Sequence, residues 1–129
     1  MKTYRAKKVS NDEYIEGYYQ RYDHDYHPVE HTIYDSYGGG SDIDPDTIAL
    51  ATGKFDINGE QIFASIGNRG GDICKWGHKT FKNKGKPTEL SERKYQAKFG
   101  LDGLTWGDFT YSQFIYRDTE NHLEIVGIE

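Results

Sequence analysis

The sequence has little of what builds a secreted or membrane protein. Its 129 residues include a single cysteine, Cys74, so no internal disulfide can form and a disulfide-stapled secreted fold is excluded. No apolar run approaches the roughly 20 residues that a membrane helix needs. The N-terminus, Met1 to Arg5, is polar and has no apolar stretch of the kind a signal peptide needs. We therefore expect a soluble protein of the reducing cytoplasm, with no contact to a membrane.

Leucine and alanine are also scarce. There are 5 of each, against 11 isoleucines and 11 tyrosines. Leu, Ile, Val and Phe together number 25, which is few for a globular chain. The 11 Tyr, 6 Phe and 2 Trp compensate, because each ring buries on the order of 150 to 250 Å² when packed. Because β-branched and aromatic side chains suit a half-buried pleated surface, we predict one mainly β domain.

Turn signals divide the chain into short strands, as in a small meander or barrel. Asn58-Gly59 between two short runs predicts a tight hairpin turn over 55–63, with positive φ at Gly59. Asp44 before Pro45 predicts a helix start, from which we expect one or two helical turns ending at Gly53. Residues 89–98 form either a short helix or the entry to a strand. The other predicted strands are 4–9, 13–22, 31–34, 72–76, 95–99, 104–111, 114–117 and 123–128.

Charge is divided unevenly along the chain. Residues 11–62 hold twelve acids and two bases, a net of −10, whereas residues 75–98 hold eight bases and two acids, a net of +6. The acidic region is rich in tyrosine, which is favoured at protein contacts because its ring is rigid and amphipathic. We predict a protein-interaction surface there, with these residues: Tyr18, Tyr22, Tyr26, Tyr34 and Tyr37. Pairing of the acidic region with the basic region of another copy would support a homo-oligomer.

Four stretches carry a family resemblance. They are Tyr4-Arg5-Ala6-Lys7 followed by Glu13 to Tyr19; Asp44-Pro45-Asp46-Thr47; Thr52-Gly53 with Asp56, Asn58-Gly59, Ile62-Phe63 and Gly71-Asp72-Ile73; and Leu123 to Ile128. In this order they resemble the YopX-like family of bacteriophage and prophage proteins. The sequence departs from the family pattern at Tyr14, where the family has Trp, and at Ala64 to Gly70, seven residues where the family has one.

The resemblance implies several coiled β-sheets with an SH3-like barrel in the C-terminal half and one or two short helical turns. It implies a single YopX-like domain over 1–129, with an N-terminal β subdomain at 1–51 and the barrel subdomain at 52–129. It also implies a phage or prophage accessory protein in the cytoplasm of a bacterial host. The family has no assigned activity or cofactor, so the resemblance bears on fold more than on function.

Residues typical of metal sites occur without a matching motif. Two groups stand close in the sequence: His24, His27 and His31, and Asp42, Asp44 and Asp46. Pro28 breaks any helix that would align the histidines. The aspartates lack the glycine and glutamate that complete a calcium loop, so we assign them to caps and turns. Cys74 has no base near it in the sequence and is expected to pack as a small apolar residue. We predict no enzyme, no metal and no cofactor.

The segment 75–86 mixes cations with aromatic rings. Its candidate binding residues are Lys75, Trp76, Lys79, Phe81, Lys82, Lys84 and Lys86. A loop of an SH3-like barrel can present such residues to a phosphate backbone, with rings free to stack on bases. The alternative is a solvated hairpin tip, with Trp76 and Phe81 turned into the core.

Three functions are compatible with these features. The first is a non-enzymatic protein that binds a host or phage protein through the tyrosine-rich acidic region. The second is a nucleic-acid-binding module that uses residues 75–86, with weak affinity because the whole chain has a net charge of −5. The third is a small-ligand binder with a pocket between the two subdomains.

Overall fold

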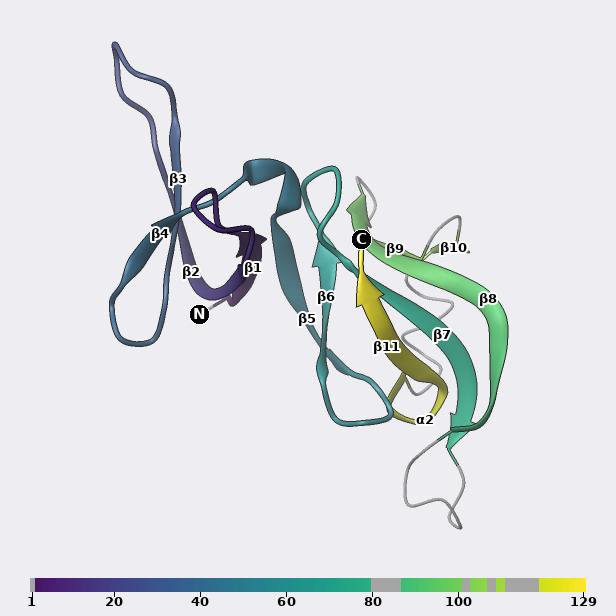
Figure 1. The fold of residues 1–129 in the computed structure, drawn as a ribbon. Coiled ribbons are helices and arrows are strands. Elements are labelled where there is room, and N and C mark those ends of the chain that lie inside the picture. The colour runs from purple at the N-terminus through teal and green to yellow at the C-terminus, as the bar shows by residue number, and fades with distance from the viewer. Residues whose placement is uncertain (1, 80–86, 101–102, 107–108, 111–118) are drawn as a thin grey trace.

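The computed structural model describes residues 2–79, 87–100, 103–106, 109–110 and 119–129. For residues 76–79, 87–95, 100, 103–106, 109–110 and 121 it describes the backbone only. The described residues are mostly in strands, with one 3-10 turn and one helical turn of four residues (Figure 1). The predicted mainly β class is confirmed. None of the described helices is long and apolar enough to cross a membrane.

The eleven strands among the described residues form one curled sheet. They pair in the order β10-β9-β8-β6-β5-β1-β2-β3-β4, and β7 joins β8 to β11. The elements, in chain order, are β1 Tyr4–Lys7, β2 Tyr14–Tyr22, β3 Glu30–Tyr34, β4 Gly40–Asp42, η1 Pro45–Thr47, β5 Ala49–Phe55, β6 Gln61–Ser65, β7 Asp72–Lys79, β8 Pro87–Gly100, β9 Gly103–Trp106, β10 Phe109–Thr110, α2 Thr119–His122 and β11 Leu123–Ile128.

The sheet has two distinct parts. Strands β2, β3 and β4 make a twisted antiparallel ribbon at one end of the molecule, and β5 to β8 curl with β11 into a half-barrel at the other (Figure 1). The barrel-like C-terminal half expected from the sequence is confirmed in this form. Strand β5 links the parts, because it pairs with β1 on one edge and with β6 on the other.

Each part has its own buried side chains. At the base of the ribbon, a cluster of Ala6, Ile15, Ile33, Ile43 and Ile48 excludes water, with Tyr4 and Tyr19 packed against it. In the half-barrel, Ile62, Cys74 and Leu123 have no exposed surface. Such burial supplies most of the free energy that stabilises a small domain.

The hairpin predicted at Asn58-Gly59 is confirmed. Strands β5 and β6 are joined by a tight turn in which Gly59 has a φ of +79°. The Gly59 N–H donates to the Asp56 carbonyl at 3.0 Å, and the Asp56 N–H donates to the Glu60 carbonyl at 2.8 Å. The positive φ explains the glycine, since residues with a Cβ resist that conformation.

The helix predicted after Asp44 is only partly confirmed. The Asp44 carboxylate accepts the Asp46 N–H at 3.0 Å and Pro45 begins the turn, as expected. The extension to Gly53 is wrong, because η1 ends at Thr47 and Ala49–Phe55 is strand β5. Pairing along both edges of β5 outweighs the local helix signal.

Most other strand predictions are confirmed. Residues 89–98 take the strand alternative, within β8, and the predicted last strand is β11. The single strand predicted at 104–111 is wrong, because β9 and β10 are two short strands that pair antiparallel, with Phe109 opposite Trp106. The strand predicted at 114–117 lies outside the described residues.

Candidate functional site

Three of the five predicted interaction tyrosines lie on one face of the ribbon. Side chains two positions apart in a strand point to the same side, so Tyr18 and Tyr22 share a face of β2. Tyr34 of β3 is directly opposite Tyr18 in the strand register, and residues so paired project from the same face. We call Tyr18, Tyr22 and Tyr34 the tyrosine face.

The tyrosine face is open to solvent and internally ordered. Tyr18 is 47% exposed and Tyr22 37% exposed, whereas Tyr34 is half-buried. A hydrogen bond with the Tyr22 side chain is the main cause that raises the pKa of Tyr34 above its ordinary value. The Tyr34 ring lies over Gly40 of β4, where a Cβ would come within 2.7 Å of Tyr34 Cε1. Gly40 thus leaves room for the ring to lie against the ribbon.

The opposite face of the ribbon belongs to the core. Ile33 is completely buried there, and Tyr19 packs edge-on against Tyr4 with ring centroids 5.4 Å apart. The Tyr19 hydroxyl shares a hydrogen bond of 2.6 Å with His31 Nδ1, and burial raises the pKa of Tyr19. The ribbon therefore has one face that stabilises the fold and one face of aromatic rings in water.

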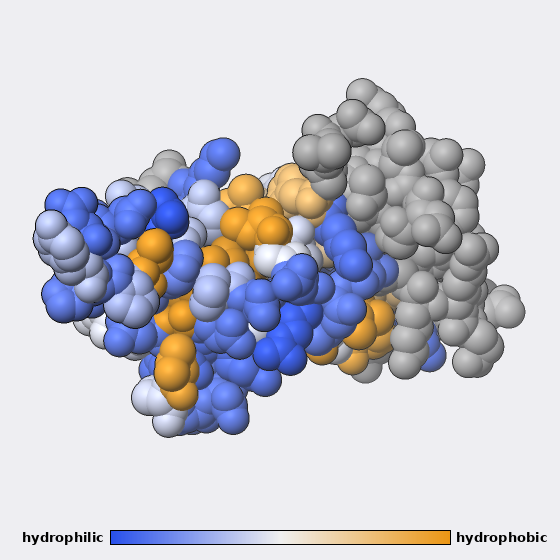
Figure 2. Space-filling model, turned by 90° about the horizontal axis from the view of Figure 1, so that it is seen from above, coloured by the Kyte–Doolittle hydropathy of each residue, from blue (hydrophilic) through white to orange (hydrophobic). Residues whose placement is uncertain are grey.

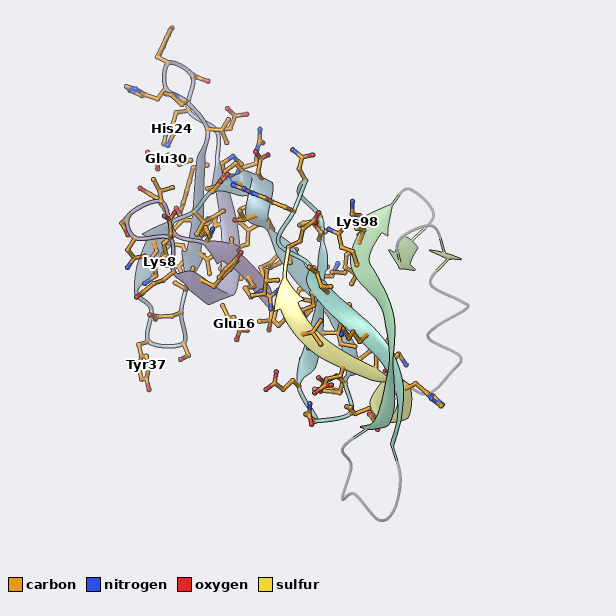
Figure 3. All side chains as sticks on the ribbon, turned by 45° about the vertical axis from the view of Figure 1, so that its right-hand side comes forward. Lys8, Glu16, His24, Glu30, Tyr37 and Lys98 are labelled. Atoms are coloured by element: carbon orange, nitrogen blue, oxygen red, sulfur yellow. The ribbon has the colours of Figure 1, made fainter. Side chains whose placement is uncertain are left out.

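The remaining two tyrosines of the prediction lie apart from this face. Tyr26, in the turn between β2 and β3, is 95% exposed, and Tyr37, in the turn between β3 and β4, is 96% exposed. Tyr37 projects at one end of the ribbon, and His24 and Glu30 lie at the other (Figure 3). Tyr26 and Tyr37 therefore do not belong to the tyrosine face.

The predicted basic segment falls mostly beyond what the structure describes. Lys75 is half-buried in β7, opposite Glu124 of β11 and Lys94 of β8 in the strand register. The backbones of Trp76 and Lys79 belong to β7, and their side chains are not described. The candidates outside the described residues are Phe81, Lys82, Lys84 and Lys86. The nucleic-acid site stays a prediction.

The residues weighed as metal ligands make other contacts. His31 bonds Tyr19, and the His24 ring stacks on Tyr22 with centroids 6.3 Å apart. Asp44 caps η1. Within the ranges that the structure describes, no group of three or more His, Cys, Asp or Glu side chains is placed to hold a metal ion. The predicted turn and cap roles account for Asp44.

Cys74 packs in the core of the half-barrel, as predicted. It has no exposed surface, and burial raises the pKa of its thiol far above the ordinary value. The nearby Asp72 and Asp56 carboxylates act in the same direction. A thiol in this environment stays protonated and is a poor nucleophile.

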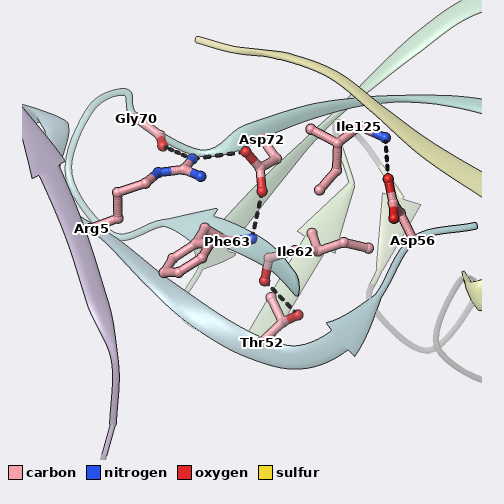
Figure 4. Close-up of polar contacts among 8 residues, drawn as sticks. All are labelled: Arg5, Thr52, Asp56, Ile62, Phe63, Gly70, Asp72 and Ile125. Carbon is pink, nitrogen blue, oxygen red and sulfur yellow. Dashed lines mark hydrogen bonds and ion pairs between the residues drawn. The ribbon is translucent and has the colours of Figure 1, made fainter. Parts of the chain in front are cut away.

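A buried ion pair joins the first strand to the half-barrel. The Arg5 guanidinium donates to Asp72 Oδ1 at 2.8 Å and to the Gly70 carbonyl at 2.9 Å (Figure 4). The same guanidinium lies over the Phe63 ring, 4.5 Å from its centroid. Sequence reasoning did not single out this pair, because the two partners come from distant strands and neither has a local motif.

The second carboxylate oxygen of Asp72 bonds the backbone of strand β6. Asp72 Oδ2 accepts the Phe63 backbone N–H at 2.7 Å. Burial raises the pKa of Asp72 more than the Arg5 charge and the Phe63 N–H lower it. The carboxylate is held between a cation and a backbone donor, which is the arrangement of a structural ion pair rather than a proton-transfer group.

A second buried carboxylate joins the hairpin to the last strand. Asp56 Oδ1 accepts the backbone N–H groups of Asn58 and Glu60, each at 2.9 Å. Its Oδ2 accepts the Ile125 N–H of β11 at 3.0 Å (Figure 4). Asp56 therefore orders the turn and ties it to β11 at the same time.

Two hollows open beside these contacts. One, of about 460 Å³, lies between β1–β2 and the strands β6 and β11, and we call it the seam hollow. The other, of about 430 Å³, borders Tyr18 and Tyr34, and we call it the tyrosine hollow. Both are lined by Thr3 and Glu16. Seen from above, the described surface is mainly hydrophilic, with apolar side chains in separate patches (Figure 2).

Comparison with known proteins returned no relative. No protein-family model matches the chain, and neither a curated protein nor a solved structure matches it. The resemblance to the YopX-like family thus stays a prediction from the sequence.

Proposed function

We propose that this protein is a non-enzymatic binding module whose tyrosine face docks on another protein. The observation that carries the proposal is the division of the ribbon, in which one face fills the core while the other presents Tyr18, Tyr22 and Tyr34 to water. None of these three rings belongs to the buried cluster at the base of the ribbon. On binding, they would remove a large apolar area from water while their hydroxyls keep hydrogen bonds.

Charge indicates the kind of partner. The region of residues 11–62 has a net charge of −10. Its exposed acids include Glu30, which is opposite Tyr22 in the strand register, and Asp35, which lines the tyrosine hollow. Complementary charge steers partners together and selects among them. We propose a partner with a basic surface. The YopX-like resemblance supports a phage or prophage accessory role, in which that partner is a host or phage protein of the bacterial cytoplasm.

Affinity capture with matched variants tests the proposal. Tagged wild-type protein, the Tyr18→Ser/Tyr34→Ser variant and the control Tyr26→Ser/Tyr37→Ser are used to capture proteins from nuclease-treated bacterial extract. We expect a defined protein to be retained by the wild type and the control and lost by the face variant, and to bind again when purified. Equal retention by all three would contradict the proposal. Sedimentation of the purified protein identifies the case in which the partner is a second copy.

Nucleic-acid binding through residues 75–86 is a second candidate. The observation that favours it is the net charge of +6 over residues 75–98, in a chain whose total is −5. The segment joins β7 to β8, which pair antiparallel. The dependence of binding on salt concentration tests it.

A further inference from the structure

The seam hollow exists because two strands of the half-barrel do not pair with each other. Among the described strands, β11 pairs only with β7, and β6 pairs with β5 and at one position with β8. The facing edges instead use carboxylates, since Phe63 donates to Asp72 and Ile125 donates to Asp56. These two N–H groups are therefore already satisfied, and what the hollow offers a ligand is its lining of side chains.

The seam hollow has an apolar lining with uncompensated acids. Phe63, Ile125 and Ile128 supply apolar surface, and Ile128 is 37% exposed. Glu16 and Glu60 also line it and are exposed. Neither glutamate forms an ion pair within the part of the chain that the structure describes. The hollow therefore suits a cation with an apolar stem, as in lysine or arginine.

Arg5 does not neutralise these acids. It lies opposite Glu16 in the β1–β2 register, yet its guanidinium turns to Asp72 and Gly70. Its Nε is buried and has no hydrogen-bond partner among the described residues.

The two hollows share part of their lining. Thr3 and Glu16 line both, so Glu16 stands between the Tyr18–Tyr34 pair and the seam. Figure 3 shows Glu16 between the ribbon and the half-barrel. A segment bound at the tyrosine face has a lined route past Glu16 toward Glu60.

We infer that the partner of the tyrosine face contributes an extended basic segment that lies along this path. Its tyrosine-contacting end occupies the tyrosine hollow, and its lysine or arginine side chains pair with Glu16 and Glu60 over the apolar lining of the seam. This inference rests on the proposed function and adds the chemistry of the partner. Charge complementarity and the lining that the two hollows share at Thr3 and Glu16 carry it.

A peptide titration tests it. The probe is a blocked nonapeptide of alternating lysine and valine, and the matched peptide replaces each lysine with glutamate. Backbone NMR shifts are followed at Thr3, Glu16, Gln61 and Gly127, which line the seam hollow. At low salt we expect the lysine peptide to shift these signals and the glutamate peptide to leave them unchanged, since screening is weakest there.

Variants separate the outcomes. The Glu16→Gln/Glu60→Gln variant should bind the lysine peptide with an affinity about tenfold lower or more. The control Glu13→Gln/Glu120→Gln has the same change in charge, and its affinity should fall by about twofold or less. Equal weakening by both pairs, or no shift at the seam, would overturn the inference. Equal binding of free lysine amide would assign the seam hollow to a small ligand and also overturn it.

The failure of this inference is distinguishable from that of the proposed function. Suppose that the captured partner is lost with Tyr18→Ser/Tyr34→Ser but binds Glu16→Gln/Glu60→Gln normally. The proposal that the tyrosine face binds a protein is then kept, and the inference of a basic segment in the seam hollow is wrong. If both variants bind the partner normally, both proposals fail.

Discussion

The guanidinium of Arg5 meets the carboxylate of Asp72 at 2.8 Å across 67 positions of sequence. The side chains are 9% and 1% exposed, so solvent screens their attraction little. Strand β1 also pairs with β5 at Tyr4 and Arg5. The ion pair thus adds a second attachment between the first strand and the half-barrel.

Replacing Arg5 with Met should destabilise the protein by about 3 to 5 kcal/mol, because Asp72 is left buried without its cation. Urea unfolding followed by circular dichroism measures the loss. The control is Arg21→Met, which removes an exposed contact of 3.8 Å to Asp23 and should cost no more than about 1 kcal/mol. Equal losses in the two variants would show that the buried pair contributes no more than a surface pair.

The stability lost in Arg5→Met should depend on pH. Burial raises the pKa of Asp72 above its ordinary 3.8, so the contribution of this group to stability is complete below that value and declines as pH rises through the folded pKa. Without Arg5 the pKa rises further, and the decline continues to higher pH. The difference between wild type and variant should therefore grow as the pH rises above the ordinary pKa of 3.8. A difference that shrinks over this range would contradict the assignment.

Replacing Gly59 with Val should destabilise the protein by about 1 kcal/mol or more, because a β-branched residue resists positive φ. A Cβ at Gly59 would meet no atom within 4 Å, so the cost comes from the backbone alone. Gly127→Val is the control, since a Cβ there also meets nothing and the backbone is not left-handed. Melting temperatures of the two variants give the comparison, and an unchanged value for Gly59→Val would contradict this account of the turn.

Neutralising Lys79, Lys82 and Lys84 tests the nucleic-acid candidate. Loss of about three phosphate contacts should flatten the logarithmic salt dependence of binding by nearly three units. Fluorescence anisotropy with labelled single- and double-stranded DNA and RNA measures the slope. If the wild type binds none of them at low salt, where this attraction is largest, the candidate is discarded.

Ring substitutions refine that test. Phe81→Ala should cost roughly 1 to 3 kcal/mol of binding per base if the ring stacks, with stability unchanged, and roughly 3 to 5 kcal/mol of folding if the ring is core. We expect Trp76→Ala to behave as a core substitution. The expectation for Trp76 is contradicted if its replacement lowers affinity but not the melting temperature.

Features whose chemistry is local were predictable from the sequence. The Asn58-Gly59 turn and the Asp44 cap each depend on a few adjacent residues, and both were predicted. The alternation of Tyr18 and Tyr22 likewise follows from strand geometry. The helix expected up to Gly53 failed because β5 is decided by its neighbours β1 and β6 rather than by its own sequence.

The buried carboxylates were not predictable as contacts. Asp56 and Asp72 look like ordinary turn and strand-start acids, and only the folded chain brings Ile125 and Arg5 to them. The register that sets Tyr34 opposite Tyr18 also depends on the path of the chain between β2 and β3. A weak signal was present for Asp72, an acid at the start of the otherwise apolar run Ile73-Cys74.

The two carboxylates differ in when their partners exist during translation. Arg5 and Phe63 are already synthesised when Asp72 is added, so the partners of Asp72 are present as soon as it is. Asp56 must wait for Ile125, 69 positions later, which at about 5 to 20 residues per second is roughly 3 to 14 s. In that interval the β5–β6 hairpin of the nascent chain lacks the contact between Asp56 and β11. Strand β7, which pairs with β11 in the folded protein, then has an edge open to chaperones, and a neighbouring nascent chain could add to it as an intermolecular strand.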